Sequence, residues 1–186
     1  MRSLLFLLAV VASGFAGAQE QRQPARLSYS YAELRFVDVD ENDGDGFEFN
    51  GSFELGSNWI VLGGVTLLDF DSNVDSTTFE IGGGYVYPYR SNFDLLGTVR
   101  FIRTDVESPF GDFDDSGVAV SAGVRGMFAP NFEVRGLVNH VNLDDSDTFL
   151  EFAVDYHFTN RVAAGLSVDV GGDSDVWSVG GRWFFR

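Results

Sequence analysis

The sequence predicts an all-β protein, a single antiparallel barrel of ten strands joined in up-and-down order. Three observations lead to this prediction. Apolar and polar residues alternate along ten segments of 10 to 13 residues, which is the period of a strand with one apolar and one polar face. The connections alternate between short turns and longer acidic loops. The last segment, 175–185, alternates large aromatic residues with small or polar ones.

The first residues predict export from the cytoplasm. Arg2 precedes an apolar run over residues 4–12, and small residues follow before Gln19. This pattern is typical of a secretory signal peptide, here residues 1–18, that is cleaved from the mature protein. A membrane anchor is the alternative, but a helical span needs about 20 apolar residues. Residues 19–26 are then a short N-terminal periplasmic segment.

The barrel is expected over residues 27–186. The alternation is clearest where Phe47, Phe49 and Phe53 alternate with Glu48 and Glu54. The register of the first and third segments is the least clear. The strands are expected at 27–38, 46–55, 59–70, 76–87, 92–104, 116–128, 131–143, 147–158, 161–170 and 175–185.

The connections are of two kinds. The short ones contain Gly, Pro or Asn, which supply turn geometry; they lie at 56–58, 88–91, 129–131 and 159–160. The long ones are acidic and lie at 39–45, 71–75, 105–115, 144–146 and 171–174. Four turns and five loops give ten strands, with both chain ends on the side of the short turns.

The charged residues decide which way the apolar faces point. A soluble barrel would turn these faces inward, whereas a membrane barrel turns them toward lipid. An Arg facing mid-membrane lipid costs about 2–4 kcal/mol, but acids and Arg can pair inside a closed lumen. Aromatic residues also gather near the strand ends, as in interfacial girdles. The sequence therefore predicts a transmembrane barrel whose lumen holds Glu33, Glu48, Glu54, Glu80, Asp94, Glu133, Glu151, Asp155 and Asp169 beside Arg35, Arg100, Arg125, Arg135 and Arg182.

The C-terminal segment resembles the insertion signal of bacterial outer-membrane β-barrels. Gly180, Trp183 and Phe185 match the pattern of a glycine followed by alternating aromatics, although Arg186 follows the usual terminal aromatic. The resemblance implies a Gram-negative outer-membrane location, with membrane lipid and lipopolysaccharide as surroundings. It also implies recognition by the barrel-assembly machinery through these three residues.

Composition excludes several functions. The chain has no cysteine, so it has neither disulfides nor thiolate chemistry. A net charge of −16 argues against nucleic-acid binding. Barrels of eight strands fill their lumen with side chains, whereas those of 16–18 hold an aqueous channel. A ten-stranded barrel with this many luminal charges is expected to have a largely blocked interior.

No catalytic residues are predicted. Asp155 and His157 share a strand face, which is similar to the Asp-x-His pair of the omptins, ten-stranded outer-membrane proteases. Omptins are much longer, however, and their site lies at the outer rim, whereas His157 is beside a short turn. We therefore expect a luminal histidine paired with a neighbouring acid. His140 falls on the lipid-facing side near mid-depth, and no Ser accompanies a His and an acid as a nucleophile.

Acidic residues are concentrated in the loops. Of 28 acids, 18 lie in the loops and their flanks, where Arg103 is the single basic residue. The acidic stretch from Asp38 fails the EF-hand pattern, because its sixth residue is Asp43 instead of Gly. We therefore predict no specific metal site and no cofactor, only weak shared binding of Ca²⁺ or Mg²⁺ at the rim. The candidate residues are Asp40, Asp43, Asp45, Asp112, Asp114, Asp115, Asp144, Asp145 and Asp147.

These features favour a non-enzymatic role. The barrel is expected to contribute to envelope integrity or to surface interactions with a ligand that the sequence does not identify. Divalent cations could bridge its acidic loops to lipopolysaccharide phosphates. The alternative is a narrow porin-like channel that prefers cations.

Overall fold

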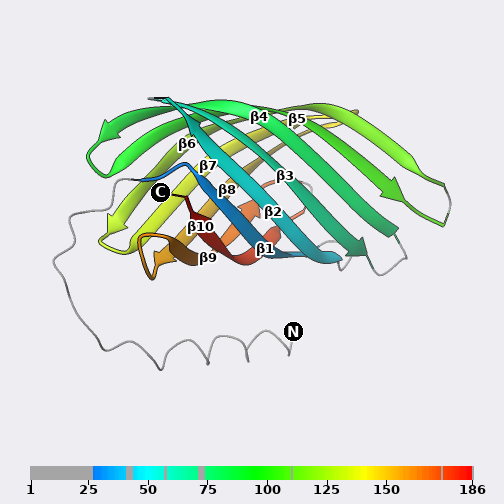
Figure 1. Cartoon of the computed structure of the whole chain (residues 1–186). Helices are drawn as coiled ribbons and strands as arrows, with labels where there is room; N and C mark the ends of the chain where they lie inside the picture. The colour runs from blue at the N-terminus through cyan, green and yellow to red at the C-terminus, as the bar shows by residue number, and fades with distance from the viewer. Residues whose placement is uncertain are drawn as a thin grey trace, which may run out of the picture.

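The computed structural model describes residues 27–40, 44–56, 58–70, 74–109, 111–172 and 174–185. They form a closed barrel of ten antiparallel strands, which confirms the predicted fold class (Figure 1). The expected signal peptide 1–18 and segment 19–26 lie outside the described residues. No helix in the described part of the chain is long and apolar enough to cross a membrane. The strands are β1 Tyr31–Val39, β2 Gly44–Leu55, β3 Trp59–Phe70, β4 Val74–Arg90, β5 Phe93–Glu107, β6 Phe113–Ala129, β7 Phe132–Asn142, β8 Ser146–His157, β9 Val162–Val170 and β10 Val176–Phe184.

The sheet closes between the first and the last strand. Each strand pairs with its neighbour in the sequence, and β1 pairs with β10 from Tyr31 opposite Phe184 to Val39 opposite Val176. The strands are tilted, and β1 begins at the end where β10 stops (Figure 1). Closure leaves no edge strand, so the ladder can satisfy the backbone groups that lipid could not.

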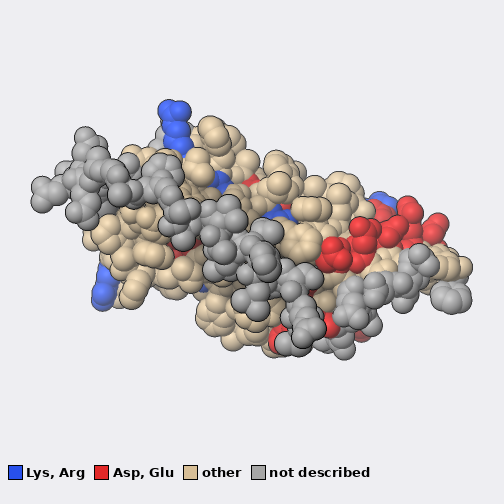
Figure 2. All heavy atoms as spheres, turned by 90° about the horizontal axis from the view of Figure 1, so that it is seen from below, with Lys and Arg blue, Asp and Glu red and all other residues tan. Residues whose placement is uncertain are grey.

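The apolar faces point outward. Ile81 in the middle of β4 is 68% exposed and Phe128 near the end of β6 is 77% exposed, whereas alternate residues face the lumen. On the face seen in Figure 2, uncharged residues cover the middle of the barrel and acidic residues gather toward one end. A soluble protein rarely exposes so large an apolar surface. The outer wall is therefore suited to lipid.

The first strand begins later than predicted. Residues 27–30 do not join the sheet, because they fold into the mouth of the barrel at the short-turn end. Tyr29 there is only 5% exposed and packs against Ile60 and Val86. The sequence suggested a strand from residue 27 because the apolar and polar alternation continues through this segment. Packing inside the lumen overrides that pattern.

Strands β4, β5 and β6 are longer than predicted, with 17, 15 and 17 residues. The β5–β6 ladder continues to Val106 opposite Phe113. Strand β7 already ends at Asn142, opposite Val118 of β6. The β5–β6 hairpin therefore continues past its β7 neighbour at the loop end. Its acidic residues suggested a loop, but backbone pairing does not require apolar side chains.

Candidate functional site

A buried ion-pair network fills one side of the lumen at the short-turn end. Its centre is Glu133 of β7, which is 0% exposed. Arg125 of β6 donates to both carboxylate oxygens of Glu133, at 2.7 and 3.0 Å, and Arg182 of β10 donates at 2.8 Å. His157 Nε2 lies 3.0 Å from Glu133 Oε2, and its ring stacks on Phe184. The Glu133 carboxylate thus connects β7 to side chains of β6, β8 and β10, and two of these side chains are guanidinium groups.

The network continues onto β1. Arg182 Nη2 lies 3.0 Å from Glu33 Oε1 and 3.4 Å from Asp155 Oδ2. Arg35 contacts the same two acids, at 2.6 and 3.4 Å. Together with Glu133 and Arg125, the network holds three carboxylates and three guanidinium groups. Such balance is what a low-dielectric interior requires, because an unpaired buried charge is costly.

Tyr29 blocks the other side of the lumen. Its backbone N–H donates to Glu54 at 2.6 Å, and its hydroxyl donates to Asp94 at 3.0 Å. The Arg125 guanidinium lies 4.6 Å from the centre of its ring, a cation–π contact. Burial raises the pKa of the Tyr29 phenol, which therefore stays protonated and remains a donor. Ile60 and Val86 complete an apolar cluster around the ring.

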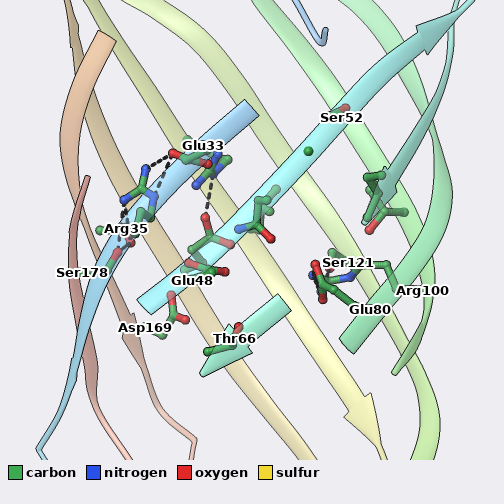
Figure 3. Close-up of a pocket in the computed structure, with 18 of the residues that line it drawn as sticks. Glu33, Arg35, Glu48, Ser52, Thr66, Glu80, Arg100, Ser121, Asp169 and Ser178 are labelled. Atoms are coloured by element: carbon green, nitrogen blue, oxygen red, sulfur yellow. Dashed lines mark hydrogen bonds and ion pairs between the residues drawn. The ribbon is translucent and has the colours of Figure 1, made fainter. Parts of the chain in front are cut away.

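Two cavities lie on either side of Tyr29 and Ile60, which line both. One cavity, of about 360 Å³, lies at the short-turn end and is lined by Asp94, Met127 and turn residues. The other, of about 290 Å³, lies toward the loops and is called the outer chamber here. Its wall is strongly polar (Figure 3). It includes Glu33, Arg35, Glu48, Ser52, Thr66, Glu80, Arg100, Arg125, Arg135, Glu151, Ser167, Asp169 and Ser178.

Most charges on the chamber wall are paired. Arg100 donates to Glu80 at 3.0 Å, and Arg135 donates to Glu151 at 2.6 Å. Arg35 lies beside Glu33 and Ser178 (Figure 3). Glu48 and Asp169 differ, because no basic group of the described residues lies within ion-pair distance, 4.0 Å, of either. The chamber thus carries two acids without a cationic partner.

The two histidines lie apart, on different faces of the barrel wall. His157 is luminal as predicted, but its acid partner is Glu133 on β7, and Asp155 instead pairs with arginines. His140 faces outward as predicted and bonds Thr148 at 2.8 Å. His140 lies two residues from the loop end of β7, opposite Val120 in the middle of the longer strand β6.

The described rim candidates occupy the loop end, where several of them have protein partners. Asp115 accepts from the backbone N–H of Asp144 at 2.8 Å, and Asp147 accepts from Thr148 at 2.6 Å. Asp114 lies 3.6 Å from Arg103. Within the described residues, no three His, Asp or Glu side chains converge to hold a metal ion. Asp40, Asp45, Asp112 and Asp145 also lie at this end, whereas Asp43 lies outside the described residues.

Figure 2 shows acidic residues gathered toward the loop end of the barrel. The exposed and half-buried acids at the loop end form what we call the acidic rim. Its described members are Asp38, Asp40, Asp45, Asp69, Asp75, Asp105, Glu107, Asp112, Asp114, Asp115, Asp144, Asp145, Asp147 and Asp175. Arg103 is the basic residue among them, paired with Asp105 at 3.0 Å.

Sequence reasoning missed Tyr29 as a luminal residue. It also missed Asn139, which is 2% exposed and joins Ser121 at 2.5 Å to the Arg100 side chain at 3.3 Å. The inward parity of Asn139 on its strand could have revealed the second, since polar residues at inward positions line the lumen. The same parity applies to Tyr29, which is two residues from Tyr31 and four from the luminal Glu33.

The fold and the charged lumen define an integral β-barrel of the Gram-negative outer membrane. The outer membrane protein beta-barrel domain matches residues 3–158, so the chain belongs to that family. Barrels of this kind turn their short turns toward the periplasm. By this rule the Tyr29 end is periplasmic and the acidic rim faces outward.

The chain is similar in fold to solved structures of the KdgM porin. The KdgM porin aligns with a TM-score of 0.54 and 12% identity, covering 84% of this chain and 99% of its own. The KdgM porin in complex with disordered oligogalacturonate aligns with a TM-score of 0.51 and 12% identity, and the alignment again covers 84% of this chain and 99% of the porin. Ail, the attachment invasion locus protein of Yersinia pestis, aligns with a TM-score of 0.43 and 16% identity. This alignment covers 82% of this chain and 94% of Ail. At these identities the likeness concerns the fold. No curated protein matches the chain.

Proposed function

We propose that this protein is a non-enzymatic, closed outer-membrane barrel that acts through its acidic rim. The observation that carries the proposal is the layer of buried side chains that separates the periplasmic cavity from the outer chamber. The ion-pair network around Glu133 and the apolar cluster around Tyr29 together leave no wide passage there, and Glu133 and Arg182 are almost fully buried. A general porin would need an open lumen.

The acidic rim is the surface left for interaction. Its carboxylates would repel lipopolysaccharide phosphates unless cations lay between them. Shared Ca²⁺ or Mg²⁺ at the rim would convert that repulsion into a bridge, because both ions prefer oxygen ligands. The rim would then tie the barrel to the outer leaflet and contribute to envelope integrity.

Calcium titration tests the bridge. In liposomes that contain lipopolysaccharide, the thermal midpoint should rise with Ca²⁺ and fall again when a chelator is added. The Asp112→Asn, Asp114→Asn, Asp115→Asn triple variant should lose most of this rise, because three rim carboxylates are removed. The conservative control is Glu107→Asp, which keeps the rim charge. A thermal unfolding midpoint that changes with neither calcium nor the chelator would count against the bridge.

A narrow cation-preferring channel is the second candidate. The two cavities favour it, because Tyr29 and Ile60 line both and separate them by little protein. The outer chamber is lined by five acids and four arginines, so it does not suit an anion such as the oligogalacturonate bound by the KdgM porin. Planar-bilayer recordings separate the candidates: steady cation-selective current at neutral pH supports the channel, and silence supports the closed barrel.

The C-terminal strand supports a proposed contact with the barrel-assembly machinery. Trp183 and Phe185 are 55% and 51% exposed on the outer wall, whereas Phe184 between them faces the lumen at 1%. Trp183→Ala should slow insertion by the purified machinery more than insertion into thin lipid vesicles without it. Equal slowing in both assays would argue against recognition.

A further inference from the structure

The charge balance inside the barrel leaves two acids over. Each luminal arginine already has an acid partner: Arg35 and Arg182 with Glu33, Arg100 with Glu80, Arg125 with Glu133, and Arg135 with Glu151. Asp155 shares two of the same arginines. Glu48 of β2 and Asp169 of β9 have no such partner among the described residues. Two carboxylates at close range are unfavourable unless one of them keeps a proton or a cation lies between them.

These two acids face the same part of the outer chamber. Figure 3 shows Glu48 and Asp169 close together on the chamber wall, with Thr66 nearby. Both carboxyl groups interact electrostatically with Glu151 of β8. The Asn50 side chain hydrogen-bonds Glu48, but the Oδ1 atom of Asp169 is enclosed and has no hydrogen-bond partner. One acceptor therefore remains unsatisfied at this point.

A second, neutral group on the wall is also unsatisfied. Ser52 lies on the same face of β2 as Glu48, four residues closer to the periplasm, and lines the same chamber. It is 7% exposed, and its hydroxyl has no hydrogen-bond partner. Buried polar groups are nearly always hydrogen-bonded, to protein, water or a ligand. The chamber wall therefore carries one unsatisfied carboxylate oxygen, on Asp169 of β9, and one unsatisfied hydroxyl, on Ser52 of β2.

We propose that the outer chamber binds a small aliphatic amine. Its ammonium group would lie between Glu48 and Asp169 and donate to both carboxylates, since an ammonium carries three donors. The rest of the molecule would extend along β2 toward the Ser52 hydroxyl. The chamber volume of about 290 Å³ suits a small ligand of this kind.

Other ligand classes fit less well. A dehydrated Ca²⁺ or Mg²⁺ ion needs six or more oxygen ligands, and no three acidic or histidine side chains of the described chain converge on one point. An anion would need a guanidinium group that is not already engaged by an acid. The two unpartnered carboxylates favour a cation, and the unsatisfied Ser52 hydroxyl favours one with further polar atoms.

Calorimetry with 1,4-diaminobutane tests the proposal on the purified mature barrel in detergent micelles. Saturable binding with one site per barrel is expected. The variant Glu48→Gln with Asp169→Asn should weaken it at least about tenfold, because both charged acceptors are lost. The rim variant Asp112→Asn with Asp114→Asn serves as the matched control, since it removes two acids outside the chamber, and should change the affinity less than about twofold. 1-Butanol, which lacks the ammonium group, should not bind.

A second measurement does not depend on folding of the variants. A spin-labelled alkylamine added to the wild-type barrel should broaden the NMR signals of Glu48, Ser52 and Asp169 more than those of the acidic rim. Equal loss of affinity in the rim and chamber variants, or broadening confined to the rim, would overturn the proposal. Such results would leave the rim function itself intact, because calcium bridging is read from thermal midpoints with lipopolysaccharide.

Discussion

At the scale of single residues, buried ion pairs stabilise the packing of the lumen. Glu133 alone accepts hydrogen bonds from Arg125 and Arg182 and contacts His157. Its carboxylate is fully buried, so it has no water to replace these partners. By contrast, Arg103 and Asp105 form an exposed pair on the acidic rim. Exposed pairs contribute little because water and salt screen them.

We predict that Glu133→Gln destabilises the barrel by about 3–5 kcal/mol, because two buried guanidinium groups lose their counter-charge. Urea unfolding in phospholipid vesicles measures this free energy. Asp105→Asn is the control and should leave the unfolding midpoint unchanged. If the two variants unfold at the same denaturant concentration, the network around Glu133 contributes no special stability.

At the scale of elements, the segment 27–30 separates the two cavities. It belongs to no strand, and Tyr29 reaches across the lumen to Asp94 and Glu54. Strand β3 supplies Ile60 and strand β4 supplies Val86 against its ring. The closure on this side therefore depends on one aromatic side chain from a short segment, unlike the other side, which several strands share.

Tyr29→Ala should join the cavities and give measurable single-channel current in planar bilayers, where the wild-type barrel is expected to be silent. Removing the ring opens the apolar cluster, while the sheet and its ladder are unchanged. Tyr29→Phe is the matched control: it loses only the hydrogen bond to Asp94 and should remain closed. A folded Tyr29→Ala barrel that stays silent would show that the ion-pair network closes the lumen alone.

At the scale of the whole molecule, the barrel has charged side chains inside and apolar side chains outside, which is the reverse of a soluble protein. Ile81 lies at the middle of the outer wall, whereas Phe128 lies near its periplasmic end. The cost of a charge on this wall should depend on its depth, because only the centre of the bilayer lacks water and headgroups.

Ile81→Arg is predicted to lower the unfolding free energy by about 2–4 kcal/mol, and Phe128→Arg by about 0–1 kcal/mol. Both are compared with the wild type by denaturant unfolding in phospholipid vesicles. Ile81→Val serves as a control for side-chain packing. Equal costs at the two depths would place the membrane boundary differently from the position inferred from the aromatic residues.

The strands were predictable because their period is local. Alternation of residues such as Phe47 and Glu48 follows from the backbone, in which successive side chains point to opposite faces. The boundaries of β5 and β6 were less predictable, since ladder hydrogen bonds continue through Asp105 and Asp114 regardless of polarity. Parity also identified the luminal charges, because each inward position is fixed once the strand is known.

The sequence by itself determined a ten-stranded barrel, its apolar outer wall, its acidic rim and the identity of its luminal charges. The tertiary structure alone decided which charges meet. Glu133 meets His157 of the neighbouring strand and Arg182 of β10, Tyr29 folds inward, and Glu48 and Asp169 are left without a basic partner among the described residues. The physical reason is that strand periodicity is set by neighbouring residues, whereas contacts across a lumen depend on closure and stagger of the whole sheet.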